Sequence, residues 1–153
     1  MTELLLMFAS RTQAAAEIII PALQRGDIVV SDRFTDSSLA YQGHARGLGM
    51  DVVLEAHRLA VGSLLPDITL CTMVDVETGL ARAHHRNRHA SEDARETRLD
   101  HQSLEFHKRV KEAYEKIAAR EPQRFRIIDA SGDPGTVSKK IWSEIEPLLV
   151  RSQ

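Results

Sequence analysis

Hydrophobic and polar positions along the chain follow two kinds of pattern, one typical of helices and one typical of strands, and a helical pattern comes first. From residue 3 to residue 25, apolar residues recur at helical spacing, and Gly26 follows as a stop. This pattern predicts a helix. Pro21 lies inside it and predicts a kink or a break, because proline removes a backbone donor. A second helical pattern covers residues 51–63.

Helical spacing returns in the second half of the chain. Helix signals resume at Glu77 and run into a dense charged stretch without an apolar face. A long amphipathic helix is predicted after it from the apolar positions Leu99, Phe106, Val110, Ala113 and Ile117. A terminal helix is predicted over residues 133–149, with Pro134 near its start.

Three short apolar runs between these helices read as buried strands. They cover residues 28–32, 68–75 and 124–130, and β-branched residues are frequent in them. Strands that alternate with helices predict an α/β fold, with a parallel sheet, right-handed crossovers and helices on both faces. The length of 153 residues suits a single domain over residues 1–153.

Composition narrows the classes of partner. The formal net charge of −2 does not favour a sequence-independent grip on nucleic acid. The single cysteine, Cys71, excludes an internal disulfide and fits a reducing compartment. We find no segment near the ~18 apolar residues that a membrane helix needs, and no basic region typical of a signal peptide. We therefore expect a cytoplasmic protein without a membrane or nucleic-acid partner.

Each predicted strand ends in an acid: Asp32, Asp75 and Asp129. Ligands of open parallel sheets bind beyond the carboxyl ends of the strands. For Asp75 and Asp129 the favoured interpretation is structural, since aspartate caps and starts turns well.

Asp32 differs because Arg33 follows it directly. The arginine offers a rigid fork of donors to phosphate, and the carboxylate can hold a metal or orient water. A structural ion pair is the alternative, although neighbours on a strand point to opposite faces.

The loop after Arg33 carries small hydrogen-bonding groups, Ser37 and Ser38, and then Tyr41 and Gln42. They could line a ligand. The alternative is a capped helical turn with Tyr41 packed against the body of the protein.

The first predicted helix places Arg11 one turn beyond Met7 and Phe8, so that the three can share a face. An arginine beside apolar or aromatic residues can hold a flat heterocycle by stacking and by an edge contact. The alternative is an arginine at the rim of a packed helix.

The charged stretch is rich in arginine: Arg82, Arg86, Arg88, Arg95 and Arg98. A solvated surface arm is one interpretation. A mobile lid that neutralises polyphosphate during phosphoryl transfer is the other. The histidines nearby (His84, His85 and His89) lack a carboxylate partner, so we do not expect them to bind a metal.

Together these residues resemble the thymidylate kinase family, which phosphorylates dTMP with ATP. The resemblance is carried by "ELLLMFASRTQ", "DIVVSDRFTDSSLAYQGHARGL", "LLPDITLCTMVDVETGLARA" and "RFRIIDASGDPGTV", and it covers essentially the whole chain. It implies a P-loop-kinase-like parallel sheet, ATP as co-substrate, Mg²⁺, and a homodimer formed through helices that include the one at residues 3–25.

The resemblance assigns roles on the acceptor side. Arg11 would bond the thymine edge, Ser38 would touch the base, and Tyr41 would lie beside the sugar. Arg33 would bind the phosphate, and Asp32 would serve the metal and phosphate environment. The remaining residues of the implied substrate site are Met7, Phe8, Ser37 and Gln42.

The resemblance also implies a donor side. A lid would span residues 86–98, with Arg86, Arg88 and Arg98 as candidates for the ATP phosphates and Arg98 counted among the catalytic residues. The loop at residues 129–133, which includes Ser131, Gly132 and Asp133, would lie by the adenine.

The chain departs from the family pattern at three places. Met7 stands where the family usually stacks a phenylalanine on thymine. Thr97, Arg98 and Asp100 stand where the lid usually has an aspartate before its RxE element. No GxxxxGK[ST] occurs in the 153 residues, so the P-loop lysine is lacking.

From the third departure we expect a sequence truncated at its N-terminus, without the family's first, central strand, its P-loop and its second strand, and inactive by itself. Two alternatives stay open: a degenerate nucleotide-binding module without catalysis, and another nucleoside or nucleotide monophosphate kinase.

Overall fold

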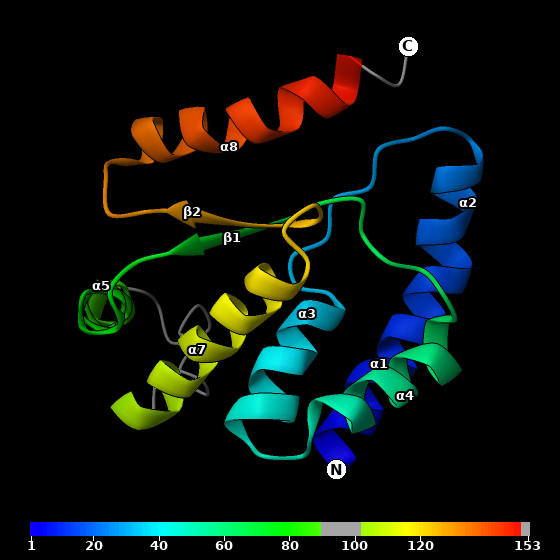
Figure 1. Cartoon of the computed structure of the whole chain (residues 1–153), viewed down its shortest axis with the longest axis horizontal. Helices are drawn as coiled ribbons and strands as arrows, with labels where there is room; N and C mark the ends of the chain where they lie inside the picture. The colour runs from blue at the N-terminus through cyan, green and yellow to red at the C-terminus, as the bar shows by residue number, and fades with distance from the viewer. Residues whose placement is uncertain (90–101, 151–153) are drawn as a thin grey trace. The chain divides into compact units, whose positions relative to one another are not determined.

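The computed structural model describes residues 1–89 and 102–150. The chain divides into two compact units, residues 1–66 and residues 67–153 (Figure 1). Each unit is described by itself. The expectation of a single domain over residues 1–153 stays a prediction.

The first unit begins with a long helix in three segments, α1 (Thr2–Ala14), the π-helix η1 (Ala15–Ile19) and α2 (Ile20–Gln24). Pro21 stands at the start of α2, and the turn before it widens, so that the Ile20 N–H donates to the Ala15 carbonyl. A π-turn absorbs the missing proline donor without ending the helix. The predicted helix is confirmed, and the predicted kink takes the form of this π-turn.

The predicted stop at Gly26 is also confirmed. Gly26 has a φ of 80°, and its N–H donates to the Leu23 carbonyl at 3.0 Å. The Asp27 N–H donates to the Ala22 carbonyl at 3.0 Å. This pair of bonds satisfies the last carbonyls of α2, and glycine reaches the left-handed conformation at low cost.

Three further helical segments complete the first unit: α3 (Thr35–Ser38), the π-helix η2 (Leu39–Ala45) and α4 (Met50–Val61). α1 packs against α4, as Figure 1 shows. Leu4, Phe8 and Val53 are buried. Burial of each such side chain stabilises the unit by about 1.5–3 kcal/mol.

The predicted strand at residues 28–32 is wrong. The structure places these residues in an extended connection that belongs to no sheet. Ile28 is 73% exposed and Val30 is 91% exposed. A β-branched run forms a strand only when a neighbouring strand accepts its hydrogen bonds, and these residues pair with none among the described parts of the chain.

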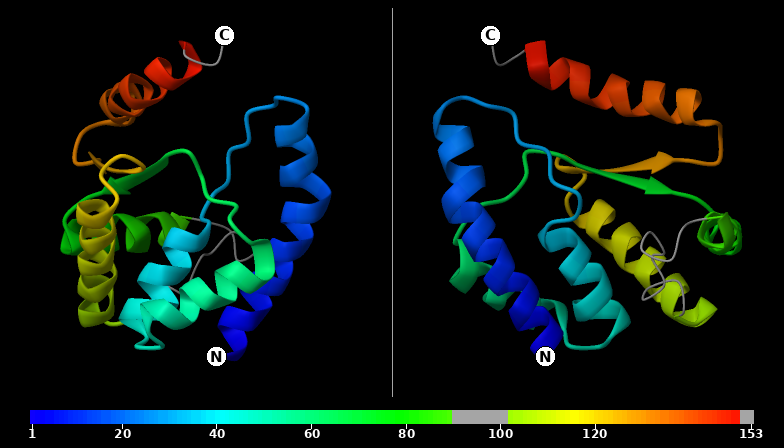
Figure 2. Two further views of the ribbon diagram at one scale, coloured as in Figure 1. Left: turned by 45° about the vertical axis from the view of Figure 1, so that its right-hand side comes forward. Right: turned by 180° about the vertical axis from the view of Figure 1, so that it is seen from behind.

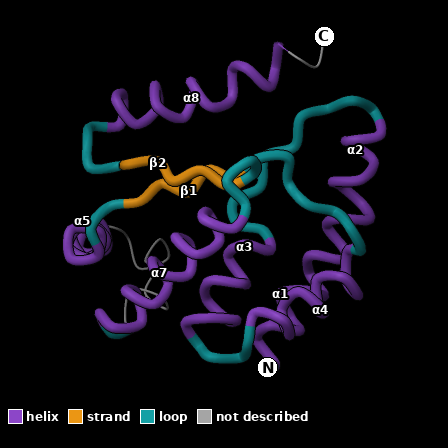
Figure 3. Tube along the Cα trace, in the orientation of Figure 1, coloured by secondary structure: helices purple, strands orange, loops and turns teal. Residues whose placement is uncertain are grey.

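The second unit contains two parallel strands, β1 (Thr69–Met73) and β2 (Phe125–Asp129). Figure 3 shows the two strands side by side. Their register runs from Thr69 opposite Phe125 to Met73 opposite Asp129. The predicted strands at residues 68–75 and 124–130 and their parallel pairing are therefore confirmed.

Helices cover both faces of this small sheet (Figure 2). The Phe125 ring stacks on Tyr114 of α7 (Leu104–Arg120), with ring centroids 5.9 Å apart. The next residue, Arg126, pairs with Glu144 of α8 (Pro134–Val150) at 3.3 Å. Successive strand residues point to opposite faces, so α7 and α8 lie on opposite sides.

The connection between the strands includes α5 (Val76–His89) and α7. The amphipathic pattern predicted for α7 is confirmed, since Phe106, Val110, Ala113 and Ile117 are all buried. Ser103 caps the helix by accepting from the Phe106 N–H at 3.1 Å. Leu99, the predicted first apolar position, lies outside the described residues.

One helix among the described residues, Thr2–Gln24, is long and apolar enough to cross a membrane by length and composition alone. The expectation that no segment approaches a membrane span is wrong by this measure. The evidence for a span is weak, because core helices and signal sequences pass the same test.

Candidate functional site

Arg11 lies between two aromatic rings in the first unit. Its guanidinium carbon is 4.5 Å from the centroid of the Phe8 ring, one turn earlier on α1. The same carbon is 5.0 Å from the centroid of the Phe34 ring, which comes from the connection before α3. A cation over two ring faces is held by both quadrupoles. The predicted association of Arg11 with Phe8 is confirmed.

The hydrogen bonds of Arg11 leave one donor unused. Nη2 donates to the Phe34 carbonyl and to Ser38 Oγ, each at 3.2 Å. Nη1 is buried and has no hydrogen-bond partner among the described residues. Burial lowers the pKa of Arg11, and the nearby Asp36 carboxylate partly offsets that shift. A buried donor without an acceptor costs about 1–3 kcal/mol, so this edge of the guanidinium suits a ligand oxygen.

Arg33 has an unusual backbone. Its φ is 65°, and among the described residues other than glycine it alone has a positive φ. Its guanidinium carbon lies 4.9 Å from the centroid of the Tyr41 ring. Asp32 and Arg33 are both exposed and lie in a bend, so the expected placement at the end of a strand is wrong. The bend directs Arg33 over Tyr41.

The segment after this bend is helical, as α3 and η2. Ser37, Ser38 and Gln42 are buried, and Tyr41 is half-buried. Gln42 Nε2 donates to Glu3 Oε1 at 2.6 Å, while Gln42 Oε1 is buried without a partner in the described structure. The helical alternative stated for this segment is confirmed for its backbone. Ser38 bonds to Arg11 and Gln42 bonds to Glu3, both on α1.

Two buried residues that the sequence did not single out lie beneath this cluster. Thr35 Oγ1 is 2.8 Å from His57 Nδ1, and the residues are 1% and 6% exposed. The His57 ring meets Phe8 and Phe34 edge-on. Sequence reasoning missed Phe34 although it follows Arg33 directly. No local signal separates His57 from an ordinary histidine on the apolar face of α4.

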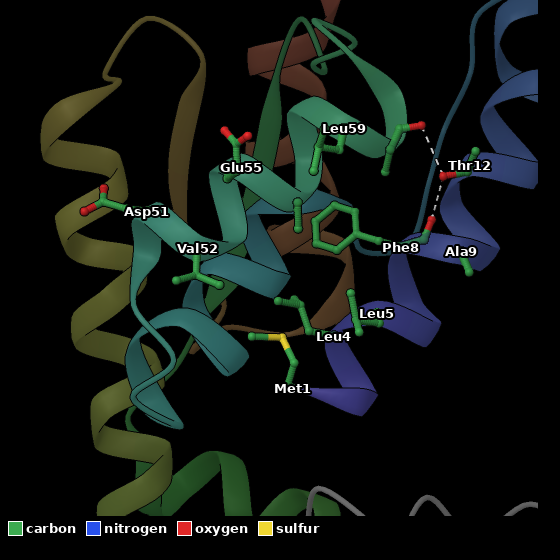
Figure 4. Close-up of a pocket in the computed structure, with 12 residues that line it drawn as sticks. Met1, Leu4, Leu5, Phe8, Ala9, Thr12, Asp51, Val52, Glu55 and Leu59 are labelled. Carbon is green, nitrogen blue, oxygen red and sulfur yellow. Dashed lines mark hydrogen bonds between the residues drawn. The ribbon is translucent and has the colours of Figure 1, made fainter.

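An open apolar groove runs between α1 and α4 (Figure 4). The Phe8 ring points across it, and Thr12 Oγ1 donates to the Phe8 carbonyl at 2.9 Å and to the Ala60 carbonyl at 3.1 Å. The groove is lined by Met1, Leu4, Leu5, Phe8, Ala9, Thr12, Asp51, Val52, Glu55, Ala56, Leu59 and Ala60. Met7 is half-buried and is not among these residues.

In the second unit, the acids at the strand ends have the structural role that the sequence favoured. Asp75 Oδ2 accepts from the Glu77 N–H at 3.1 Å at the start of α5. Asp129 Oδ1 accepts from the Ser131 N–H at 3.0 Å, and Lys140 Nζ donates to Asp129 Oδ2 at 2.7 Å. These bonds hold the pKa of Asp129 well below its usual range.

The loop predicted to lie by adenine is an ordered turn. Ser131, Gly132 and Asp133 are exposed, and Asp133 caps α8 by accepting from the Thr136 N–H at 3.1 Å. Arg82 Nη1 donates to the Ala130 carbonyl at 2.9 Å, and Nη2 donates to the Ser131 carbonyl at 3.1 Å. The turn is therefore fixed by groups of its own unit.

The structure describes only part of the segment predicted to be the lid. Arg86 and Arg88 lie on the last turn of α5, and the structure does not describe their side chains. Arg98 lies outside the described residues. Over residues 1–89 and 102–150, no group of three or more histidine, cysteine, aspartate or glutamate residues could hold a metal ion.

The residues predicted for the acceptor side thus all lie in the first unit, where Arg11 bonds to Ser38 and Arg33 lies over Tyr41. The predicted adenine loop belongs to the other unit.

Comparison with known proteins identifies the class. The family model for thymidylate kinase matches residues 1–141. A thymidylate kinase of Desulfovibrio desulfuricans is 47% identical over 149 residues, with 97% of this chain and 69% of that protein covered. Thymidylate kinases of Synechococcus sp. and Bacillus velezensis are 44% and 50% identical, covering 97% and 99% of this chain and 68% and 69% of theirs.

These matches place the chain among the kinases, which are phosphotransferases. The chain belongs to the thymidylate kinase family, and it spans roughly two thirds of the length of the curated relatives it matches. The α/β architecture with a small parallel sheet agrees with that membership.

Proposed function

We propose that this chain carries the acceptor side of a dTMP kinase, an enzyme that transfers the γ-phosphoryl group of ATP to dTMP. The observation that carries the proposal is the Arg11 guanidinium. It is held between Phe8 and Phe34, with Nη1 buried and without a partner among the described residues. A pyrimidine carbonyl would satisfy that donor, and burial would strengthen the bond.

The selectivity of this edge follows from its donors. Arg11 offers N–H groups only, so it favours the carbonyl oxygens of a pyrimidinedione. Ser38 Oγ lies 3.2 Å from Arg11 Nη2 and can donate or accept beside it. We propose that a base with an amino group at the contacted position, as in dCMP, binds less well.

Arg33 is the proposed phosphate ligand. The guanidinium forks bidentately to phosphate oxygens, and Tyr41 beneath it keeps the cation in place. The strained backbone at Arg33 supports a functional reason for this conformation, since such strain is concentrated at ligand-binding sites.

ATP is the proposed phosphate donor and Mg²⁺ the proposed metal. Mg²⁺ is commonly held by one or two carboxylates together with substrate phosphates. Asp32 supplies one exposed carboxylate next to Arg33, which fits a metal shared with the substrates. When bound, Mg²⁺ would neutralise charge on the transferring phosphoryl group. Arg86, Arg88 and Arg98 are the proposed arginines of the lid, and the turn with Ser131, Gly132 and Asp133 is the proposed neighbour of adenine.

The binding proposal is tested by calorimetry with the 153-residue chain. We expect dTMP to bind more tightly than dCMP, and we expect Arg11→Met to lower the affinity for dTMP at least tenfold. Arg58→Met is the matched control, because Arg58 is an exposed arginine that pairs with Glu55 of its own helix. Equal affinities for dTMP and dCMP would contradict the assigned base contact. They would favour a different nucleotide kinase.

We further propose that a polypeptide of these 153 residues alone does not transfer phosphoryl groups. Its sequence contains no GxxxxGK[ST] motif, and the backbone cradle and lysine of that motif supply most of the electrostatic positioning in P-loop kinases. A coupled assay of dTMP-dependent ATP consumption should stay at the background rate. Turnover that is lost in the Arg33→Ala variant would overturn this proposal.

A cytoplasmic homodimer is the proposed assembly. The groove between α1 and α4 is apolar over most of its surface. Leu5 and Leu59 at the groove are 56% and 73% exposed. Contiguous apolar surface of this kind marks interaction sites, and a second copy of the chain would bury it.

A further inference from the structure

His57 occupies a central position beneath the Arg11 cluster. It lies on the buried face of α4, one turn after Val53, and both residues are buried. Its Nδ1 is 2.8 Å from Thr35 Oγ1, the first side chain of α3. The imidazole therefore links α4 to the start of α3 by a buried hydrogen bond.

The same imidazole contacts both rings that hold Arg11. Its centroid lies 6.5 Å from that of Phe8 at an interplanar angle of 73°, and 6.3 Å from that of Phe34 at 85°. Edge-to-face contacts of this kind are favoured arrangements of aromatic rings and stabilise the packing beyond the area they bury. Both rings have the Arg11 guanidinium over a face, and both meet the His57 ring at a steep angle.

Thr35 adds a third connection. It directly follows Phe34, whose carbonyl accepts the bond from Arg11 Nη2. A hydrogen bond at Thr35 therefore restricts the position of the Phe34 carbonyl as well as that of the Phe34 ring. All three connections of His57 lead to groups that contact the one guanidinium.

We infer that His57 is a positioning residue: through Thr35 and the rings of Phe8 and Phe34, it fixes the Arg11 guanidinium in the orientation that presents Nη1 to a base. The inference rests on the proposed function only for the identity of that base. A fixed guanidinium loses less conformational entropy when the ligand binds. Support of this kind is what keeps a binding group within a fraction of an ångström of its productive geometry.

The ligand-free chain gives the first test. The Arg11 Nε–H resonance should carry a large ring-current shift from Phe8 and Phe34. Thr35→Val keeps the shape of the side chain but removes the hydroxyl, and His57→Phe keeps a ring but removes Nδ1. Both substitutions should move the Arg11 resonance toward the position of an unconstrained arginine. Thr35→Ser keeps the hydroxyl and should leave the resonance at its wild-type position.

Val53→Ala is the matched control, because it removes buried side-chain volume from the same face of α4 without touching the hydrogen bond. It should lower the free energy of unfolding while leaving the Arg11 resonance in place. Equal destabilisation in all variants with an unmoved Arg11 resonance would reduce His57 to a packing role and overturn the inference.

Ligand affinity gives the second test. Thr35→Val should lower the affinity for dTMP about fivefold, which is about 1 kcal/mol. It should leave the affinity for deoxyribose 5-phosphate, which has no base, unchanged. Equal weakening of both ligands would contradict positioning through Arg11. If the wild-type chain does not bind dTMP but the Arg11 resonance moves as expected, the positioning role holds and the proposed function fails.

Discussion

Arg33 combines backbone strain with an exposed side chain. Its φ of 65° places it in the left-handed region, which costs a residue with a Cβ about 1–2 kcal/mol. The contact of the guanidinium with the Tyr41 ring beneath it offsets part of that cost. The conformation therefore holds a cation at a fixed place on the surface of the first unit.

Glycine and alanine at position 33 should separate the strain from the charge. Arg33→Gly and Arg33→Ala both remove the guanidinium, but only glycine adopts a positive φ without strain. We expect the glycine variant to be more stable than the alanine variant by about 1 kcal/mol. Urea unfolding measures this difference.

Affinity provides the companion measurement. The two variants should lose dTMP affinity equally, since both lack the phosphate ligand. A glycine variant that still binds dTMP like the wild type would remove Arg33 from the proposed site.

At the scale of single residues, the sequence predicted some of the side chains that contact Arg11 and missed others. Arg11 and Phe8 share a helix, so helical spacing alone brings them together. Phe34 is 23 residues from Arg11 along the chain, and His57 belongs to another helix. Their meeting depends on how three helices pack, and no local pattern encodes that packing.

Gly43 shows how closely two elements of the first unit approach. A Cβ at this position of η2 would lie 3.3 Å from Met50 Cα and 3.3 Å from Val53 Cγ2. Backbone of α4 cannot move away as a flexible side chain could. The absence of a side chain at Gly43 therefore permits this contact.

Gly43→Ala should destabilise the chain by about 1 kcal/mol, because overpacking of about 1–3 kcal/mol exceeds the gain in helix propensity. Thermal and urea unfolding measure the change. In a Val53→Ala background one of the close contacts disappears, so the cost should shrink. An equal cost in both backgrounds would show that the Val53 contact is not the cause.

The free energy of unfolding should depend on pH because of Asp129, at the turn between β2 and α8. The bonds from Lys140 and Ser131 lower the pKa of Asp129 in the folded state. A depressed folded pKa contributes stability above the unfolded value of about 3.9, and the contribution is lost as the pH falls through the folded pKa. Asp129 is exposed, so salt should weaken the effect.

Asp129→Asn should therefore lower the free energy of unfolding at pH 7, and the difference from wild type should narrow as the pH falls below about 3.9. Urea unfolding at several pH values measures it. Lys140→Met should reproduce the loss, whereas Lys139→Met serves as the control at the neighbouring position. A difference that stays constant down to pH 3 would exclude this ionic origin.

Among the elements, the sequence was right where local pattern and available partners agreed. β1 and β2 are apolar runs that pair with each other, and α7 buries its predicted face. Residues 28–32 have the same strand-like composition, but in the described part of the chain no strand lies beside them. Composition predicts what a segment can form, and only the rest of the fold decides whether it finds a partner.

At the scale of the whole molecule, the groove between α1 and α4 should govern association. We expect Leu59→Arg to weaken self-association at least tenfold, because it would bury a charge in an apolar contact. Sedimentation equilibrium at several concentrations measures this. Leu54→Arg is the matched control, since Leu54 is exposed on α4 but does not line the groove.

Equal effects of the two substitutions would show that the groove is not the contact surface. A wild-type chain that stays monomeric at all concentrations would contradict the proposed homodimer directly.

The π-turn at Ala15–Ile19 changes the phase of the apolar stripe on the first helix. One additional residue in a turn rotates everything after it by about 100° relative to a regular helix. Ile18, which a regular helix would place within about 60° of the middle of the Leu4–Phe8 stripe, is nevertheless 65% exposed. One helix thus presents its apolar residues in two directions, and Pro21, which has no backbone N–H to donate, stands directly after the turn where the direction changes.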